Sequence, residues 1–256
     1  KGAELSHSNL MFNALTCNRL FQTAPATDIH LLTLPLFHSF GSTVQMNAGF
    51  AVAATLVLLP RFDAEAAVGL MQKENVTFFA GVPTMWWGLL GALEGADVDK
   101  IAGNLRIACS GGASLPVEII KEVKARLGVQ ILEGYGLSET SPVATFSDPD
   151  RDPRPGSIGI PIWGVELKLI DPEWNTIEGA DEIGEIAIRG HNIMNGYLNR
   201  PEATAEVLSG GELHTGDIGF LDDHGLLHLR DRKSLVILRG GANVYPAEVE
   251  AALDAF

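Results

Sequence analysis

The first 147 residues alternate between short apolar runs and segments of helical periodicity, and this alternation limits the fold more than any other feature. The runs are largely apolar and four or five residues long, at 31–34, 55–59, 76–79, 105–108 and 129–132. Runs of this kind are typical of strands that are covered on both faces. Asp63 stands where it can cap a helix, and Pro83 and Pro116 stand where each can open one. The alternation therefore predicts an α/β fold, with helices layered on a mostly parallel sheet.

From about residue 148 the pattern changes to alternating polar and apolar residues. A polar, proline-rich segment at 147–156 separates the two parts of the chain. Alternation then follows at 165–170, 184–189 and 226–229. It is typical of strands with one solvated face, and residues 222–225 are those of a hairpin turn. We therefore predict an α/β subdomain over 1–147 and a small antiparallel β subdomain over 148–230.

The charge and apolar content exclude several classes of partner. The chain has 18 Lys and Arg against 32 Asp and Glu, a net charge of −14, so a nucleic-acid backbone would be repelled and no such partner is expected. Cys17 and Cys109 lie in apolar surroundings, as buried thiols of a reducing, cytoplasmic compartment do. The longest apolar stretch, 48–59, is too short to span a bilayer, so no transmembrane segment is expected. Peripheral membrane contact stays open, although no amphipathic basic helix in the sequence argues for it.

Glycine is in excess, and several glycines lie in motifs that can carry chemistry. The chain has 28 glycines in 256 residues, about 11% against a usual ~7%. Residues 110–114 read SGGAS directly after a predicted strand. Glycines there allow a ligand to approach the backbone closely. A tight turn between a strand and a helix is the alternative interpretation.

A second glycine motif, EGYGLSET at 133–140, also follows a predicted strand. It nearly matches the dinucleotide fingerprint, but Glu139 stands where the third glycine is expected. A carboxylate repels phosphate unless a divalent cation bridges the two, and Mg²⁺ is held in this way by one carboxylate and substrate phosphates. Tyr135 would offer a flat face to a purine and Ser138 a hydroxyl to a phosphate. The alternative is a structural turn with an exposed glutamate.

Two single residues are further candidates. Asp217, in LHTGD at an expected strand end, is placed to accept both hydroxyls of a ribose, although aspartate is also a common turn residue. His38 ends the segment PLFH, where a catalytic role and a core or rim position are both consistent with the sequence. The sequence contains no GxxxxGK[ST] motif and no metal-type cluster of Cys and His.

Taken in order, these motifs resemble those of the adenylate-forming acyl-CoA synthetase superfamily, and specifically of the fatty-acid CoA ligases. Residues 1–7 resemble the tail of the family's phosphate loop, and 135–139 its adenine, phosphate and Mg²⁺ motif, with Ser138 where threonine is usual. Residues 184–204 match a run of the family's β subdomain. Residues 215–217 resemble the ribose motif, and 231–250 the domain hinge.

The resemblance implies a two-step reaction with ATP, Mg²⁺ and CoA. A fatty-acid carboxylate attacks the α-phosphate of MgATP, and the CoA thiol then displaces AMP from the acyl-adenylate. The implied ATP-binding residues are Gly112, Ala113, Glu133, Gly134, Tyr135, Gly136, Ser138, Asp217 and Arg232, the last two at the ribose. The implied catalytic residues are His38, Ser138 and Glu139, with Glu139 also the Mg²⁺ ligand. The acyl chain would run past His38, Val82, Pro83 and Gly112.

The resemblance also implies that 231–256 comprise a hinge, around Ser234, and the start of a lid domain. Ser234 and Leu235 stand where the family usually has charged hinge residues. The lid lysine and the phosphate-loop glycines would lie outside the chain, so we expect a piece of a longer enzyme that by itself binds nucleotide weakly and is inactive. Another carboxylic acid, a carrier-protein acceptor, or a non-catalytic remnant of the fold are the alternatives.

Overall fold

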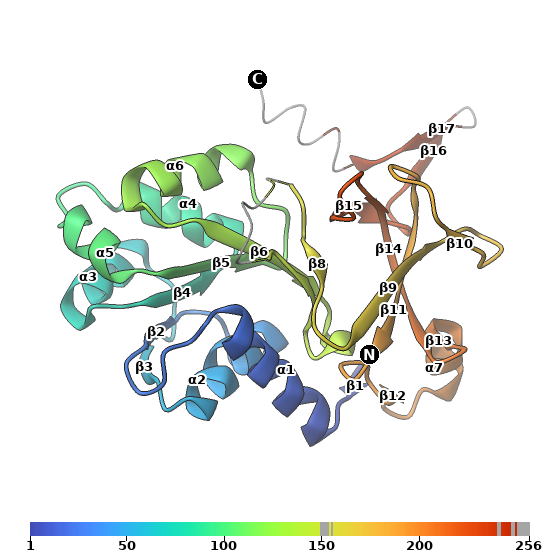
Figure 1. The fold of residues 1–256 in the computed structure, drawn as a ribbon, viewed down its shortest axis with the longest axis horizontal. Helices are drawn as coiled ribbons and strands as arrows, with labels where there is room; N and C mark the ends of the chain where they lie inside the picture. Colours follow the sequence, from blue (N-terminus) through green and yellow to red (C-terminus); the bar gives the residue numbers. More distant parts are fainter. Residues whose placement is uncertain (149–153, 155, 240–241, 247–248, 250–256) are drawn as a thin grey trace.

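The computed structural model describes residues 1–148, 154, 156–239, 242–246 and 249 in two parts that lie side by side (Figure 1). The first part is a sheet covered by helices, and the second is built mainly from antiparallel strands. The predicted α/β fold followed by an antiparallel β region is confirmed. The predicted hinge residues at 240–241, 247–248 and 250 lie outside the described residues.

The first part has a seven-stranded sheet with the order β3-β2-β4-β5-β6-β7-β8. Its parallel strands are β2 (Ile29–Leu32), β3 (Thr55–Leu58), β4 (Phe78–Gly81), β5 (Ile107–Gly111) and β6 (Ile131–Gly136). The antiparallel strands are β7 (Val143–Phe146) and β8 (Ile160–Pro161). The sheet therefore extends past residue 148, to β8.

Three strands begin two residues later than the apolar runs predict. Val76, Leu105 and Val129 precede β4, β5 and β6, and each is buried although it lies outside the strand. Apolar residues in the turns between helices and strands enter the core in the same way as strand residues. Apolar runs alone therefore locate these strands but not their first residues.

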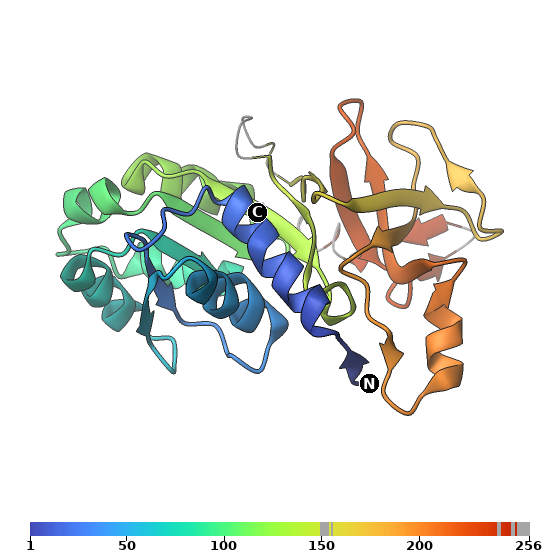
Figure 2. The ribbon, with the colours of Figure 1, turned by 60° about the horizontal axis from the view of Figure 1, so that its bottom comes forward.

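Helices cover both faces of this sheet (Figure 2). One face carries α1 (His7–Leu20), the π-helix η1 (Phe40–Asn47) and α2 (Ala48–Ala51). The other carries α3 (Ala64–Glu74), α4 (Pro83–Gly91), α5 (Val98–Asn104) and α6 (Val117–Leu127). Asp63 caps α3, since its Oδ1 accepts from the Ala66 amide at 2.8 Å, and Pro83 lies in the first turn of α4. Both helix starts are as predicted.

The second part is a six-stranded antiparallel sheet with the order β10-β9-β11-β14-β13, in which β15 also pairs with β14. Its strands are β9 (Val165–Ile170), β10 (Thr176–Ile177), β11 (Gly184–Gly190), β13 (Leu208–Ser209), β14 (Glu212–Leu221) and β15 (Leu227–Arg232). Helix α7 (Pro201–Val207) precedes β13, and β16 (Ile237–Arg239) pairs with β17 (Ala242–Val244). The predicted strand end at 213–217 is wrong, because these residues lie inside β14.

Two short strands join the start of the chain to the second part. β1 (Ala3–Glu4) pairs antiparallel with β12 (Gly196–Tyr197). The N-terminus therefore lies beside β12, next to the loop that follows β6 (Figure 1). A further short helix, η2 (Ser138–Thr140), forms that loop.

The two cysteines lie in the core of the first part. Cys17 and Cys109 are free thiols and both are buried, as expected. Burial raises the pKa of the Cys17 thiol to about 12. Across the residues that the structure describes, none of the helices is both long and apolar enough to pass through a membrane.

Candidate functional site

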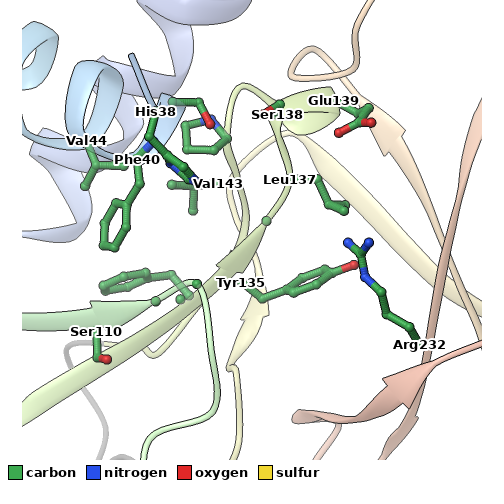
Figure 3. A pocket seen from close by; sticks show the side chains of 17 residues that line it. His38, Phe40, Val44, Ser110, Tyr135, Leu137, Ser138, Glu139, Val143 and Arg232 are labelled. Atoms are coloured by element: carbon green, nitrogen blue, oxygen red, sulfur yellow. The ribbon is translucent and has the colours of Figure 1, made fainter. Parts of the chain in front are cut away.

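A cavity of about 310 Å³ opens at the carboxyl ends of β5 and β6, where the parallel part of the sheet meets antiparallel β7 (Figure 3). It is lined by His38, Ser39, Phe40, Val44, Ser110, Gly111, Gly112, Gly134, Tyr135, Gly136, Leu137, Ser138, Glu139, Pro142, Val143, Phe146 and Arg232. Ligands of open α/β sheets bind at the carboxyl ends of the strands, so the position itself favours a binding site.

Most of the residues predicted from the sequence meet at this cavity. Its lining includes the predicted residues His38, Gly112, Gly134, Tyr135, Gly136, Ser138, Glu139 and Arg232. The lining does not include Val82, Pro83, Ala113, Glu133, Asp217 or Ser234. The individual roles of all these residues stay predictions.

Tyr135 connects the two parts of the molecule at the cavity. Its hydroxyl donates a 2.6 Å hydrogen bond to Oδ2 of Asp217, from β6 to β14. Asp217 lies opposite Arg232 in the pairing of β14 with β15, and its Oδ1 is 3.1 Å from Nε of Arg232. Figure 3 shows the Tyr135 side chain extended toward Arg232. The predicted adenine residue and the two predicted ribose residues thus form one cluster.

Burial sets the ionisation of this cluster. The Asp217 side chain is 5% exposed, and this burial raises the pKa of its carboxyl, although the hydrogen bond from Tyr135 and the charge of Arg232 oppose the rise. Burial also raises the pKa of Tyr135, and the Asp217 carboxylate raises it further. The tyrosine therefore remains a hydrogen-bond donor at neutral pH. Arg232 is 60% exposed, so its remaining guanidinium donors can reach a ligand in the cavity.

The glycines of β6 have a structural cause. A Cβ on Gly136 would lie 1.8 Å from the carbonyl oxygen of Pro142, and one on Gly134 would lie 2.6 Å from the Phe146 ring. The close approach that requires glycine at these two positions is that of β7. Both glycines also line the cavity, and their predicted role at the nucleotide stays a prediction. Gly112 differs, because its φ of +84° is one that side-chain-bearing residues rarely adopt.

Ser138 and Glu139 project from η2, and Figure 3 shows Ser138 between His38 and Glu139. Within the described part of the chain, no three His, Cys, Asp or Glu side chains are grouped to hold a metal ion. One carboxylate with an adjacent hydroxyl still fits Mg²⁺, which in nucleotide sites takes one or two protein carboxylates and completes its shell with phosphate and water. Glu139 is thus the residue that would hold it, with the Ser138 hydroxyl beside it for a phosphate oxygen.

His38 lies exposed at the rim, just before η1. Its Nδ1 accepts a 3.1 Å hydrogen bond from the amide of Phe40. A neutral histidine whose Nδ1 accepts carries its proton on Nε2. His38 therefore presents an N–H donor beside the cavity.

The apolar wall of the cavity is the part that the sequence did not reveal. Phe40 and Val44 come from η1, Leu137 comes from the glycine motif, and Val143 and Phe146 come from β7. The apolar run at 143–146 was the available signal, since it follows the motif within a few residues. Of the predicted acyl-pocket residues, His38 and Gly112 belong to the lining. Val82 does not, but its Cγ1 is 3.6 Å from the point where Gly112 would carry a Cβ.

Glu133 lies beside the cavity but is turned into the protein. Its side chain is buried, and burial raises the pKa of its carboxyl to about 7, while hydrogen bonds with the backbone of Leu115 and Gly156 oppose the rise. The structure therefore places this predicted ATP-binding residue in a buried position on β6, against the loop before α6.

The turn between β15 and β16 contains Ser234, the predicted hinge residue. Ser234 is exposed, and the turn is closed by the amide of Leu235, which donates to the carbonyl of Arg232 at 2.8 Å. The predicted pivot thus begins two residues after the arginine that lines the cavity.

Comparison with known proteins identifies the family to which the chain belongs. Residues 1–198 match the family described as AMP-binding enzyme. The chain is 37% identical to the long-chain-fatty-acid–CoA ligase of Bacillus subtilis, with 99% of the chain and 45% of that protein aligned. It is 35% identical to the feruloyl-CoA synthase of an Amycolatopsis species, with 99% and 51% aligned. The chain thus spans about half the length of the curated relatives it matches.

Solved structures of related enzymes superpose closely on this chain. ATP-bound MatB from Rhodopseudomonas palustris superposes with a TM-score of 0.92 at 34% identity, over 100% of this chain and 50% of that one. The O-succinylbenzoate coenzyme A synthetase of Bacillus subtilis, in complex with ATP and magnesium, superposes with a TM-score of 0.89 at 31% identity, over 99% and 51%. The chain therefore belongs to the AMP-binding enzyme family, whose relatives here are adenylate-forming CoA ligases.

Proposed function

We propose that the protein containing this chain activates a carboxylic acid with MgATP and transfers the acyl group to CoA, and that the acid is a long-chain fatty acid. One observation carries the proposal. The Tyr135–Asp217–Arg232 cluster, the Glu139 carboxylate and an apolar wall all meet at a single cavity. A nucleotide with an acyl group attached needs these three environments side by side.

In the first step, an oxygen of the acid attacks the α-phosphorus of ATP, and pyrophosphate leaves with the electron pair of the broken P–O bond. Tyr135 would hold the adenine, and Asp217 with Arg232 the ribose, so that the α-phosphate stays fixed. The Nε2–H of His38 and the hydroxyl of Ser138 would donate to the oxygens on which negative charge accumulates. A bound Mg²⁺ would supply neutralisation of phosphate charge.

In the second step, the CoA thiol gives up its proton to solvent, and its sulfur adds to the carbonyl carbon of the acyl-adenylate. The C–O bond to AMP then breaks and the thioester forms. The cluster around Asp217 would retain AMP as the leaving group. The apolar wall would keep the acyl chain in place and exclude water, which otherwise hydrolyses the adenylate.

The choice of a fatty acid is supported by the wall and by the relatives. Phe40, Val44, Val143 and Phe146 form an apolar surface suited to an alkyl chain. Long-chain-fatty-acid–CoA ligases of Bacillus subtilis and Escherichia coli are among the relatives, at 37% and 36% identity. Others are named for feruloyl, succinylbenzoate and indoleacetate substrates, so aromatic acids are the alternatives to test.

The test is ATP–pyrophosphate exchange by the protein encoded in the complete reading frame around this chain. Palmitate, ferulate and 2-succinylbenzoate are supplied in turn, and thioester formation with CoA is then measured. Exchange that is fastest with palmitate supports the proposal. Exchange with only an aromatic acid overturns the fatty-acid assignment, and exchange without a CoA thioester points to a carrier-protein acceptor.

A matched pair of variants controls the exchange assay. Glu139→Gln is expected to abolish exchange, whereas Glu118→Gln is expected to leave it unchanged. Glu118 lies on the exposed surface of α6 with its side chain 82% exposed. No exchange with any acid, together with nucleotide binding by the 256-residue chain, would show a non-catalytic binding module.

A further inference from the structure

The segment 192–198 connects the start of the chain to the loop that carries Glu139. The amide of Asn195 donates to the carbonyl of Glu4 at 2.9 Å, and the amide of Leu198 donates to that of Gly2 at 2.8 Å. The amide of Met194 donates to the carbonyl of Glu139 at 2.9 Å. The segment thus holds both neighbours by backbone hydrogen bonds.

Tyr197 is the side chain of this segment that reaches the cavity's acidic residue. Its hydroxyl donates a 2.7 Å hydrogen bond to Oε1 of Glu139. Within the described residues, Oε2 of Glu139 accepts no hydrogen bond. The carboxylate therefore has one oxygen fixed and one available to a ligand.

The ring of Tyr197 has a second contact. Nζ of Lys1 lies 4.9 Å from the centre of the ring, within the range of a cation–π interaction. One side chain thus contacts both a cation and the carboxylate of Glu139, which lines the cavity. A phosphate needs a positively charged group such as the Lys1 ammonium, and its divalent cation needs a negatively charged group such as the Glu139 carboxylate.

Thr204 secures the backbone of Tyr197. Its Oγ1 accepts a 2.9 Å hydrogen bond from the Tyr197 amide and donates to the carbonyl of Arg200 at 2.9 Å. The tyrosine hydroxyl therefore does not have to hold the segment in place. Its only hydrogen bond within the described residues is the one to Glu139.

We propose that Tyr197 is a positioning residue for the phosphate and divalent-cation side of the site, holding Glu139 through its hydroxyl and Lys1 through its ring. The inference rests on the proposed function, because it assumes that Glu139 binds the cation of a metal–nucleotide complex. An oriented carboxylate binds a metal more tightly than a free one, since its rotamers are restricted before the metal arrives. Removing the partner of a metal-binding side chain typically costs about ten- to a hundredfold in metal affinity.

The test measures Mn²⁺ binding by electron paramagnetic resonance on the 256-residue chain, with and without ATP. Tyr197→Phe keeps the ring and removes only the hydroxyl. It is expected to raise the Mn²⁺ dissociation constant of the ATP complex about tenfold or more. Thermal stability and metal-free ATP binding are expected to stay at the wild-type level.

Two further variants separate positioning from simple structural support. Thr204→Val loosens the same segment without touching Glu139, so it is expected to lower thermal stability and to lower Mn²⁺ affinity much less than Tyr197→Phe does. In a Glu139→Gln background, Tyr197→Phe is expected to cause no further loss, because the carboxylate it positions is gone.

Three results would overturn the proposed role of Tyr197. Unchanged Mn²⁺ affinity in Tyr197→Phe overturns the inference and leaves the proposed function standing. Equal losses in Tyr197→Phe and Thr204→Val also overturn it, because they show a role in folding the segment. A wild-type chain whose ATP binding gains nothing from Mn²⁺ overturns the cation role of Glu139 and this inference with it.

Discussion

Oδ2 of Asp217 accepts a 2.6 Å hydrogen bond from the Tyr135 hydroxyl, and this bond links the α/β part to the antiparallel part at the edge of the cavity. The two residues are 82 positions apart in the sequence. Because the Asp217 side chain is only 5% exposed, its oxygens depend on protein partners for hydrogen bonds. The pair therefore contributes both to the shape of the site and to the stability of the molecule.

Tyr135→Phe is expected to lower the free energy of unfolding by about 1–3 kcal/mol, since it removes a donor from a buried acceptor. Urea unfolding of the single variant, of Asp217→Asn and of the double variant measures the coupling between the two side chains. A coupling close to zero would contradict the role assigned to this hydrogen bond. Tyr245→Phe is the matched control elsewhere in the chain.

Arg232→Gln should affect ligand binding far more than stability. The arginine is 60% exposed, so solvent screens its pairing with the buried Asp217 carboxylate and the loss of stability is expected to be about 1 kcal/mol. The guanidinium that reaches the cavity is lost, so ATP affinity is expected to fall by about tenfold, equivalent to one charge-assisted hydrogen bond. Calorimetry measures the affinity and urea unfolding the stability. A large loss of stability with unchanged ATP affinity would show that Arg232 stabilises the fold and does not bind the ligand.

Glu133 should make stability depend on pH near neutrality. Its carboxyl pKa rises from 4.5 to about 7 on folding, so its stabilising effect is full below pH 4.5 and is lost as the pH rises through 7. The shift corresponds to about 3 kcal/mol at most. Glu133→Gln cannot ionise, so its stability relative to the wild type is expected to increase between pH 4.5 and 8. A difference that does not change with pH would contradict this expectation.

Asp28 should act in the opposite direction, at acid pH. Its buried carboxylate accepts from Arg106, the Ala24 amide and the Thr77 hydroxyl. Burial opposes ionisation, but these hydrogen bonds outweigh it and hold the pKa of Asp28 below its ordinary 3.8. The contribution is therefore present above about pH 4 and is lost as the pH falls further.

Asp28→Asn tests that contribution at neutral pH. It is expected to cost about 2 kcal/mol, less than a fully buried pair because Arg106 is 37% exposed. Thermal unfolding at pH 7 and pH 3.5 measures the loss. ATP affinity is expected to stay unchanged, since none of these residues lines the cavity.

Gly136→Ala is expected to prevent folding or to cost more than about 3 kcal/mol, because the added Cβ would overlap the backbone of Pro142. Gly103→Ala, in α5, is the matched control. A Cβ at that position has no neighbour within 4 Å, so the change is expected to stabilise the helix by roughly 0.5–1 kcal/mol. Yield and thermal midpoint compare the two. Equal behaviour of both variants would show that β7 does not require the glycine.

The sequence predicts the elements that local interactions determine. The apolar runs, Asp63 and Pro83 locate strands and helix starts because capping and periodicity involve residues a few positions apart. The strand containing Asp217 is different. β14 continues past this residue because it pairs with β11 and β15, which are distant in sequence. A turn residue in the sequence thus lies inside a ten-residue strand in the structure.

The candidate site divides in the same way. The nucleotide-type residues Tyr135, Glu139 and Arg232 were predicted from motifs and do line the cavity. Phe40 was not predicted, because no sequence pattern indicates the π-helix η1 in which it lies. Tyr197 was not predicted as a partner of Glu139, because the two residues are 58 positions apart and the hydrogen bond joins β12 to η2.

By itself, the sequence determined the layered α/β and antiparallel architecture and the chemical groups available for binding, because these follow from periodicity and residue type. The tertiary structure decided which groups meet, and in what environment. Tyr135 lies close to β14, and its hydroxyl therefore donates to Asp217. The close approach of β7 and the residue before it explains why positions 134 and 136 require glycine. These distances and burials arise because strand pairing brings together residues that are far apart in the sequence. The spacing of motifs along the chain does not reveal them.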